Sequence, residues 1–76
     1  MSDIAFDIVK SYGALSEEKS GWKKEVNLVS WNNRAPKFDI RDWDPYHEKM
    51  GKGVTLSLEE AKKLAELLAV VLSEGK

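Results

Sequence analysis

Cationic and aromatic side chains alternate with apolar ones over residues 37–43 (KFDIRDW). Because successive side chains of a strand point to opposite faces, this run predicts a strand with Lys37, Arg41 and Trp43 on one face. Phe38 and Ile40 then share the other face. An exposed tryptophan between basic residues is suited to stacking a nucleobase while its phosphate is held. The alternative is that Trp43 caps the core while both cations are solvated.

Residues that could support catalysis are sparse. The chain has no cysteine and one histidine, His47, whose spacing to Asp44 and Glu48 matches no metal-ligand motif. Residues 51–53 (GKG) lack the glycine spacing and the Ser or Thr of a phosphate loop. We therefore predict a binding protein that is not an enzyme and that uses no cofactor and no metal.

Four strands are predicted to position these side chains. They cover residues 3–15, 22–31, 37–43 and 52–56. Gly13 suggests a bulge in the first strand, and Asn32 and Asn33 suit the turn before the third. The alternation breaks at Leu28 and Val29, so a bulge there leaves the face of Trp31 open. The short connections predict an antiparallel meander.

A helix follows the strands. Ser57 and Glu60 form a capping box, which predicts a helix from Leu58 to about Ser73, with Gly75 just past its end. Its apolar stripe is wider than one sheet covers: Leu58, Ala61, Leu64, Ala65, Leu68 and Leu72, widened by Leu67, Val70 and Val71. This surplus predicts homodimerisation through the helix, with one sheet face left open. The alternative is a helix rolled deep into a curved sheet.

Length and charge indicate one small domain spanning residues 1–76. The net charge is −1, but residues 22–55 hold seven basic and five acidic side chains and all three tryptophans. A local patch of this kind determines phosphate contact better than the total charge does. No run is long enough for a membrane span, and no signal peptide is recognised, so we expect a cytoplasmic protein (nucleoid-associated if bacterial).

Two segments carry a resemblance to a known family. Residues 38–43 (FDIRDW), a charged loop and residues 51–57 (GKGVTLS) before a helix resemble the single-stranded-DNA-binding domain of the transcriptional coactivator positive cofactor four. Residues 23–32 (KKEVNLVSWN) with Pro36 are more similar to its bacterial YdbC-type branch. The resemblance covers roughly residues 4–72. It implies a curved four-stranded antiparallel sheet, a C-terminal helix and a homodimer with the helices at its interface.

The resemblance also implies a binding site. Arg41, Trp43 and Lys52 match family positions that contact the nucleic-acid strand. Arg34 and Lys37 fall in the basic turn that the family uses, and Trp31 takes the place of the family's aromatic residue near that turn. The predicted nucleic-acid-binding residues are Lys23, Trp31, Arg34, Lys37, Arg41, Trp43 and Lys52. Asp39 shares the predicted binding face and should repel phosphate unless it pairs with Lys37 or Arg41.

Together these observations predict an α+β protein that acts as a homodimeric single-stranded DNA-binding protein with little sequence preference. It would act in transcription regulation, replication or repair, and the choice between DNA and RNA is left open. The alternative is a protein-interaction module that uses the sheet face or the helix without binding nucleic acid. The two differ in whether an oligonucleotide quenches tryptophan fluorescence in a salt-sensitive way.

Overall fold

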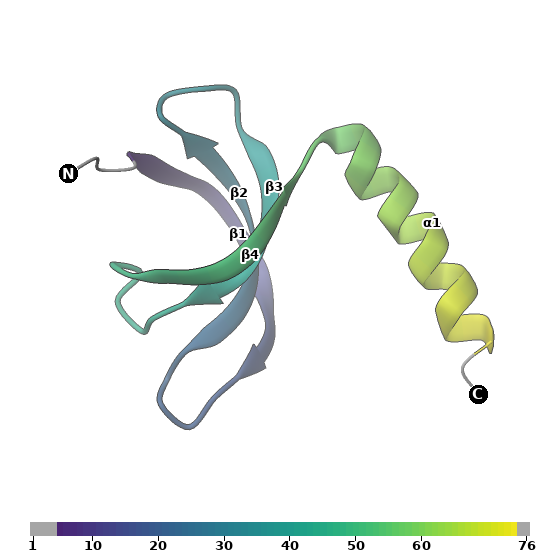
Figure 1. The fold of residues 1–76 in the computed structure, drawn as a ribbon, viewed down its shortest axis with the longest axis horizontal. Helices are drawn as coiled ribbons and strands as arrows, with labels where there is room; N and C mark the ends of the chain where they lie inside the picture. Colours follow the sequence, from purple (N-terminus) through teal and green to yellow (C-terminus); the bar gives the residue numbers. More distant parts are fainter. Residues whose placement is uncertain (1–4, 75–76) are drawn as a thin grey trace.

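The computed structural model describes residues 5–74, which form a curved sheet followed by a helix (Figure 1). The elements are β1 (Phe6–Glu17), β2 (Lys23–Trp31), β3 (Lys37–Trp43), β4 (Met50–Leu56) and α1 (Leu58–Glu74). The strand order is β1-β2-β3-β4 and every neighbouring pair is antiparallel, which confirms the predicted α+β meander. The part of the predicted first strand before residue 5, and Gly75 beyond the helix, lie outside the described residues.

The irregularity of the sheet lies in β1. Its register against β2 shifts three times, and one shift is next to Gly13, whose φ is +143°. This confirms the predicted bulge at Gly13. By contrast, β2 pairs with β3 without a shift from Lys23 to Val29. The shift in the β1–β2 register opposite Leu28 and Val29 places the extra residue in β1, so the bulge considered in β2 near Val29 is absent. Bulges increase the local twist of a strand, and those in β1 help the sheet to curl.

The curl gives the sheet an inner and an outer face. Phe6 of β1 reaches Trp43 of β3 with 5.2 Å between ring centroids, although β1 and β3 are not neighbours. The inner face is therefore the one that carries Trp43. It also carries Asn27, Val29 and Asp39, and these four side chains are fully buried.

The outer face is largely apolar, apart from Lys24, Asp42 and Lys52 at one end, and its apolar side chains are half-buried or exposed. Two rows of side chains cross it, with Val26, Ile40 and Val54 in the first and Leu28, Phe38 and Leu56 in the second. The predicted grouping of residues 37–43 into two faces is confirmed. The expectation that Trp43 lies on the exposed face is wrong, because the curl buries the inner face and leaves the outer face open.

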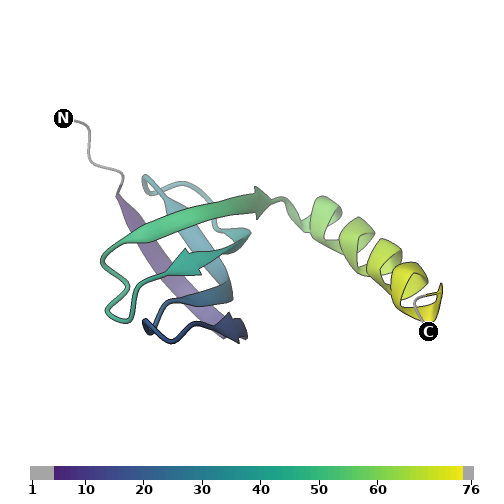
Figure 2. The same cartoon turned by 60° about the horizontal axis from the view of Figure 1, so that its bottom comes forward.

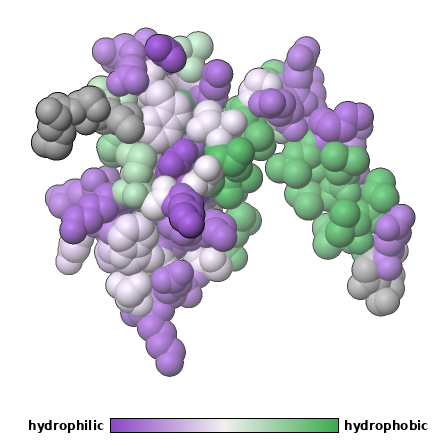
Figure 3. All heavy atoms as spheres, viewed as in Figure 1, coloured by the Kyte–Doolittle hydropathy of each residue, from purple (hydrophilic) through white to green (hydrophobic). Residues whose placement is uncertain are grey.

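The helix does not cover its own sheet. Its start is the predicted capping box: the Glu60 amide donates to the Ser57 hydroxyl at 3.1 Å, and the Ser57 amide donates to the Glu60 carboxylate at 2.9 Å. No residue of α1 is buried, and the helix extends away from the end of β4 (Figure 2). Apolar residues gather on the side of α1 that faces the sheet and on the facing side of the sheet (Figure 3). The alternative of a helix rolled into its own sheet is therefore wrong.

The loop between β3 and β4 is held by Asp44. One of its carboxylate oxygens accepts the amide hydrogens of Glu48 at 2.7 Å and Lys49 at 2.8 Å. The Asp44 amide in turn donates to the Lys49 carbonyl at 3.1 Å. The backbone hydrogen bonds, that of Lys49 first, lower the pKa of the Asp44 carboxyl below its usual value.

Acid is expected to destabilise the domain through Asp44. Because the pKa of Asp44 is lower in the folded than in the unfolded state, its contribution to stability is present above the unfolded pKa of about 4. The contribution is lost as the pH falls through the folded pKa. Urea unfolding at pH 7, 5, 4 and 3 should show wild type losing more stability below pH 4 than Asp44→Asn, which starts lower at pH 7. An equal acid-induced loss in both proteins would assign the acid sensitivity to other carboxylates.

Candidate nucleic-acid interface

A cleft with a volume of about 260 Å³ opens where the β2–β3 turn meets β4. It is lined by Trp31, Arg34, Ala35, Lys37 and Thr55. Trp31 ends β2, Lys37 begins β3, and Thr55 lies near the end of β4. The cleft thus joins a half-buried indole ring to two exposed cations.

The turn that carries the cations is held by short hydrogen bonds. Asn32 and Asn33 have φ angles of 51° and 63°, the left-handed geometry that the sequence predicts for this pair. The Arg34 amide donates to the Trp31 carbonyl at 2.9 Å, and the Ser30 hydroxyl donates to the Arg34 carbonyl at 2.7 Å. These contacts hold the backbone of Arg34 against the end of β2, where Trp31 also lines the cleft.

A charged pair lies behind the cleft. Arg41 donates from Nε to Asp39 Oδ1 at 2.7 Å and from Nη2 to Asp39 Oδ2 at 3.0 Å. The Thr55 hydroxyl donates to the same Oδ2 at 2.8 Å. The Arg41 guanidinium carbon lies over the Trp31 ring, 5.1 Å from its centroid. The pairing of Asp39 with Arg41, on which the prediction depended, is confirmed, so Asp39 does not present a free carboxylate to a ligand.

Trp31 lies on the inner face. It pairs in register with Phe6, with ring centroids 6.1 Å apart, and Arg41 of the inner face covers it. This answers the question of which face Trp31 uses. Its indole nitrogen is buried and has no hydrogen-bond partner among residues 5–74.

Trp43 lies in the core instead of at a binding surface. Its ring packs against Phe6 and, at 5.6 Å between centroids, against His47. Its exposed fraction is 0%, so the ring has no free face for a base. The structure therefore agrees with the alternative in which Trp43 belongs to the core and does not stack a base.

His47 is engaged with a carboxylate across the sheet. Its Nε2 lies 2.9 and 3.0 Å from the two carboxylate oxygens of Glu25, which is buried. Glu25 also accepts a hydrogen bond from the side-chain amide of Asn27 at 3.1 Å. Within the described part of the chain, no group of three or more His, Cys, Asp or Glu side chains could hold a metal ion.

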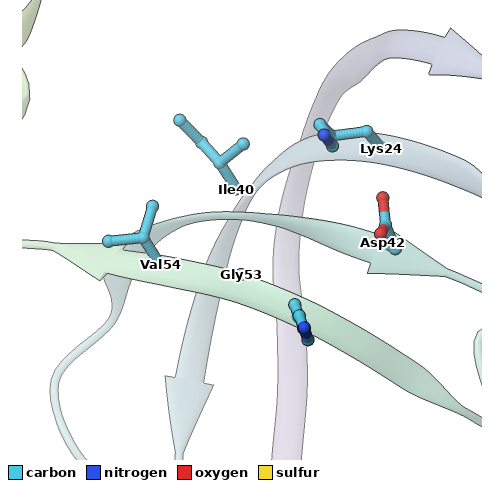
Figure 4. A pocket seen from close by; sticks show the side chains of 6 residues that line it. Lys24, Ile40, Asp42, Gly53 and Val54 are labelled. Carbon is cyan, nitrogen blue, oxygen red and sulfur yellow. The ribbon is translucent and has the colours of Figure 1, made fainter.

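The remaining predicted cations lie elsewhere. Lys52 lines a pocket of about 410 Å³ with Lys24, Ile40, Asp42, Gly53 and Val54 (Figure 4). This pocket includes apolar residues of the outer face, so Lys52 is separated from the cleft. Lys23 pairs in register with Trp43, at the end of β2 opposite Trp31.

The structure therefore divides the seven predicted residues into separate places. Trp31, Arg34 and Lys37 meet in the cleft, and Arg41 lies behind it. Sequence reasoning missed Thr55, which both lines the cleft and binds Asp39. A correct alignment of β3 with β4, which pairs Asp39 with Thr55, would have predicted that Thr55 lies at the site.

The fold is that of a small α+β protein whose curved sheet carries an open cleft, in which Trp31 lies beside the exposed Arg34 and Lys37. A ring next to cations is an arrangement suited to an anionic ligand with flat rings. Comparison of the sequence with known protein families agrees with this description. The chain belongs to the family of the transcriptional coactivator p15 (PC4), whose family model matches residues 18–67, from just after β1 into α1. This membership confirms the predicted family and supports a DNA-binding, coactivator-like role. The YdbC-type branch stays a prediction.

The chain is also similar to an uncharacterized protein of Treponema pallidum (strain Nichols). The two are 44% identical over 66 residues, which cover 87% of this chain and 78% of the relative. No helix within residues 5–74 has the length and apolar character needed to cross a membrane.

Proposed function

We propose that this protein is a homodimer that binds single-stranded DNA with little sequence preference, in transcription regulation, replication or repair. The observation that carries the proposal is the cleft that brings Trp31, Arg34 and Lys37 together. Unpaired bases expose flat faces to an aromatic ring, and each stacked base contributes about 1–3 kcal/mol. Backbone phosphates bind the cations, and the release of counterions makes the affinity salt-dependent. Duplex DNA presents no such base faces.

The dimer is supported by two apolar surfaces that lie open in one chain. The outer face exposes Val54, and α1 exposes Leu67, Leu68, Val70, Val71 and Leu72. Contiguous apolar surface of this kind is uncommon on a monomer and is typical of an interface. A second copy of the chain brings the same two surfaces, so a symmetric pair can cover both.

Oligonucleotide titration tests the proposal. We expect oligo-dT to quench tryptophan fluorescence, more strongly at low than at high salt, and a duplex of equal length to bind much more weakly. Oligo-U in a parallel titration compares RNA with DNA. Equal binding of duplex and single strand would contradict the proposal. Absence of binding to every nucleic acid would favour a protein-interaction module that uses the outer face or the helix.

Trp31→Ala is expected to weaken oligo-dT binding by about 5- to 160-fold, the equivalent of losing one stacked base. The affinity is measured by the anisotropy of a fluorescent oligo-dT, which does not depend on the protein's own emission. Tyr46→Ala is a suitable control, because Tyr46 is an exposed aromatic outside the cleft. Equal affinities of the two variants would remove Trp31 from the binding site.

A further inference from the structure

Arg41 occupies a position that suggests a phosphate contact, yet most of its hydrogen-bond donors are already used. Nε and Nη2 donate to Asp39, and Nη1 donates to the Gly51 carbonyl at 3.2 Å, with the Met50 sulfur 4.0 Å away. The Arg41 side chain is only 16% exposed, and the carboxylate that neutralises it is fully buried. A guanidinium fixed in this way has few unused N–H donors with which to bind a phosphate.

The same contacts connect two walls of the cleft. Asp39 Oδ2 accepts from both Arg41 and Thr55, and the Arg41 guanidinium lies over the Trp31 ring. Trp31 and Thr55 are cleft residues, whereas neither Asp39 nor Arg41 lines the cleft. The planar fork between arginine and carboxylate sets the plane of the guanidinium, which then restrains the indole ring that it covers.

We propose that Asp39 and Arg41 are positioning residues, a neutral pair that holds Trp31 and Thr55 as the walls of the cleft, and that Arg41 does not bind phosphate. The salt-dependent contacts then fall to Arg34 and Lys37, which are exposed and make no ion pair within residues 5–74. This inference rests on the proposed binding of single-stranded nucleic acid.

Asp39→Asn distinguishes positioning from simple charge by the sign of its effect. If Asp39 affected binding only by repelling the phosphates of the oligonucleotide, removing the carboxylate charge would tighten binding. As a positioning residue, Asp39 holds Arg41 less firmly once it is an amide, so we expect Asp39→Asn to bind oligo-dT more weakly. Tighter binding by this variant would overturn the inference.

Two further variants separate the role of the guanidinium from the role of its charge. Arg41→Lys keeps the charge and loses the fork, and we expect about 5- to 30-fold weaker binding. Asp39→Asn with Arg41→Gln replaces the ion pair by two amides and leaves no unpaired buried charge. We expect this double variant to bind more weakly, with an unchanged slope of log affinity against log salt. Lys37→Ala is the control, with a slope smaller by about 0.7, the value for one lost phosphate contact on a single strand.

Anisotropy titrations of a fluorescent oligo-dT at four salt concentrations measure all of these values, with circular dichroism to establish folding. Thr55→Val removes only the hydroxyl that binds Asp39, keeps both charges, and should weaken binding at least twofold at constant slope. A drop in slope in the double variant equal to that of Lys37→Ala would make Arg41 a phosphate contact and overturn the inference. Wild-type affinity in folded Arg41→Lys and Thr55→Val would overturn it as well. Wild type that binds no oligo-dT at any salt would instead remove the proposed function itself.

Discussion

Trp43→Ala is expected to unfold the domain. The Trp43 ring is fully buried and packs between Phe6 and His47, so its removal leaves a large cavity where the curled sheet closes on itself. Truncating a buried tryptophan to alanine lowers the free energy of unfolding by about 3–5 kcal/mol. Domains of this size bury a smaller fraction of their surface than larger domains do and are marginally stable, so this loss is comparable with their total stability. Circular dichroism and urea unfolding at pH 7 measure the effect.

Two other variants make this result specific. Tyr46→Ala removes an aromatic ring that is 78% exposed, and its effect on unfolding is expected to stay within about 0.5 kcal/mol. Trp43→Phe keeps an aromatic ring in the core and should retain the fold with reduced stability. A folded, equally stable Trp43→Ala that no longer binds oligo-dT would contradict the core assignment. It would return Trp43 to the binding surface.

Leu68→Glu is expected to convert the proposed dimer to a monomer. Leu68 is exposed in the single chain and lies in the apolar stripe of α1. A carboxylate buried without a partner in an apolar interface costs several kcal/mol, and symmetry places two of them in one dimer. Light scattering coupled to size exclusion should give the mass of one chain, 8.6 kDa, for the variant and twice that mass for wild type.

Lys62→Gln is the matched control for Leu68→Glu. It changes the net charge by the same amount, and Lys62 is exposed on α1 away from the apolar stripe. We expect it to remain dimeric. A wild-type mass of one chain at micromolar concentration would refute the dimer. A dimeric Leu68→Glu would place the interface elsewhere on the chain.

Local features of the chain were predictable because they depend on neighbours in the sequence. The alternation in residues 37–43 placed Lys37, Arg41 and Trp43 on one face, and β3 has these bounds. The capping box of α1 and the left-handed pair Asn32 and Asn33 need only a few adjacent residues, and both are present. Strand order followed from short connections, which allow consecutive strands few alternatives to pairing with each other.

The site was predicted in part for the same reason. Arg34 lies in the β2–β3 turn, and Trp31 and Lys37 flank it, so their meeting in the cleft depends on a single hairpin. Thr55 comes from β4, and its contact with Asp39 depends on strand register, which is set between distant residues. The position of Lys52 also could not be predicted locally, because its place on β4 puts it in the pocket of the outer face.

The sequence by itself determined the four strands, the helix with its cap, and which side chains of β3 share a face. Only the tertiary structure decided which of the two faces of the sheet is inside. Alternation has a period of two residues and is identical for either direction of curl, whereas the curl depends on the bulges of β1 that bring Phe6 onto Trp43. That closure buries Trp43 in the core, leaves Trp31 beside the open cleft, and turns the apolar outer face towards solvent, where a second chain can bind.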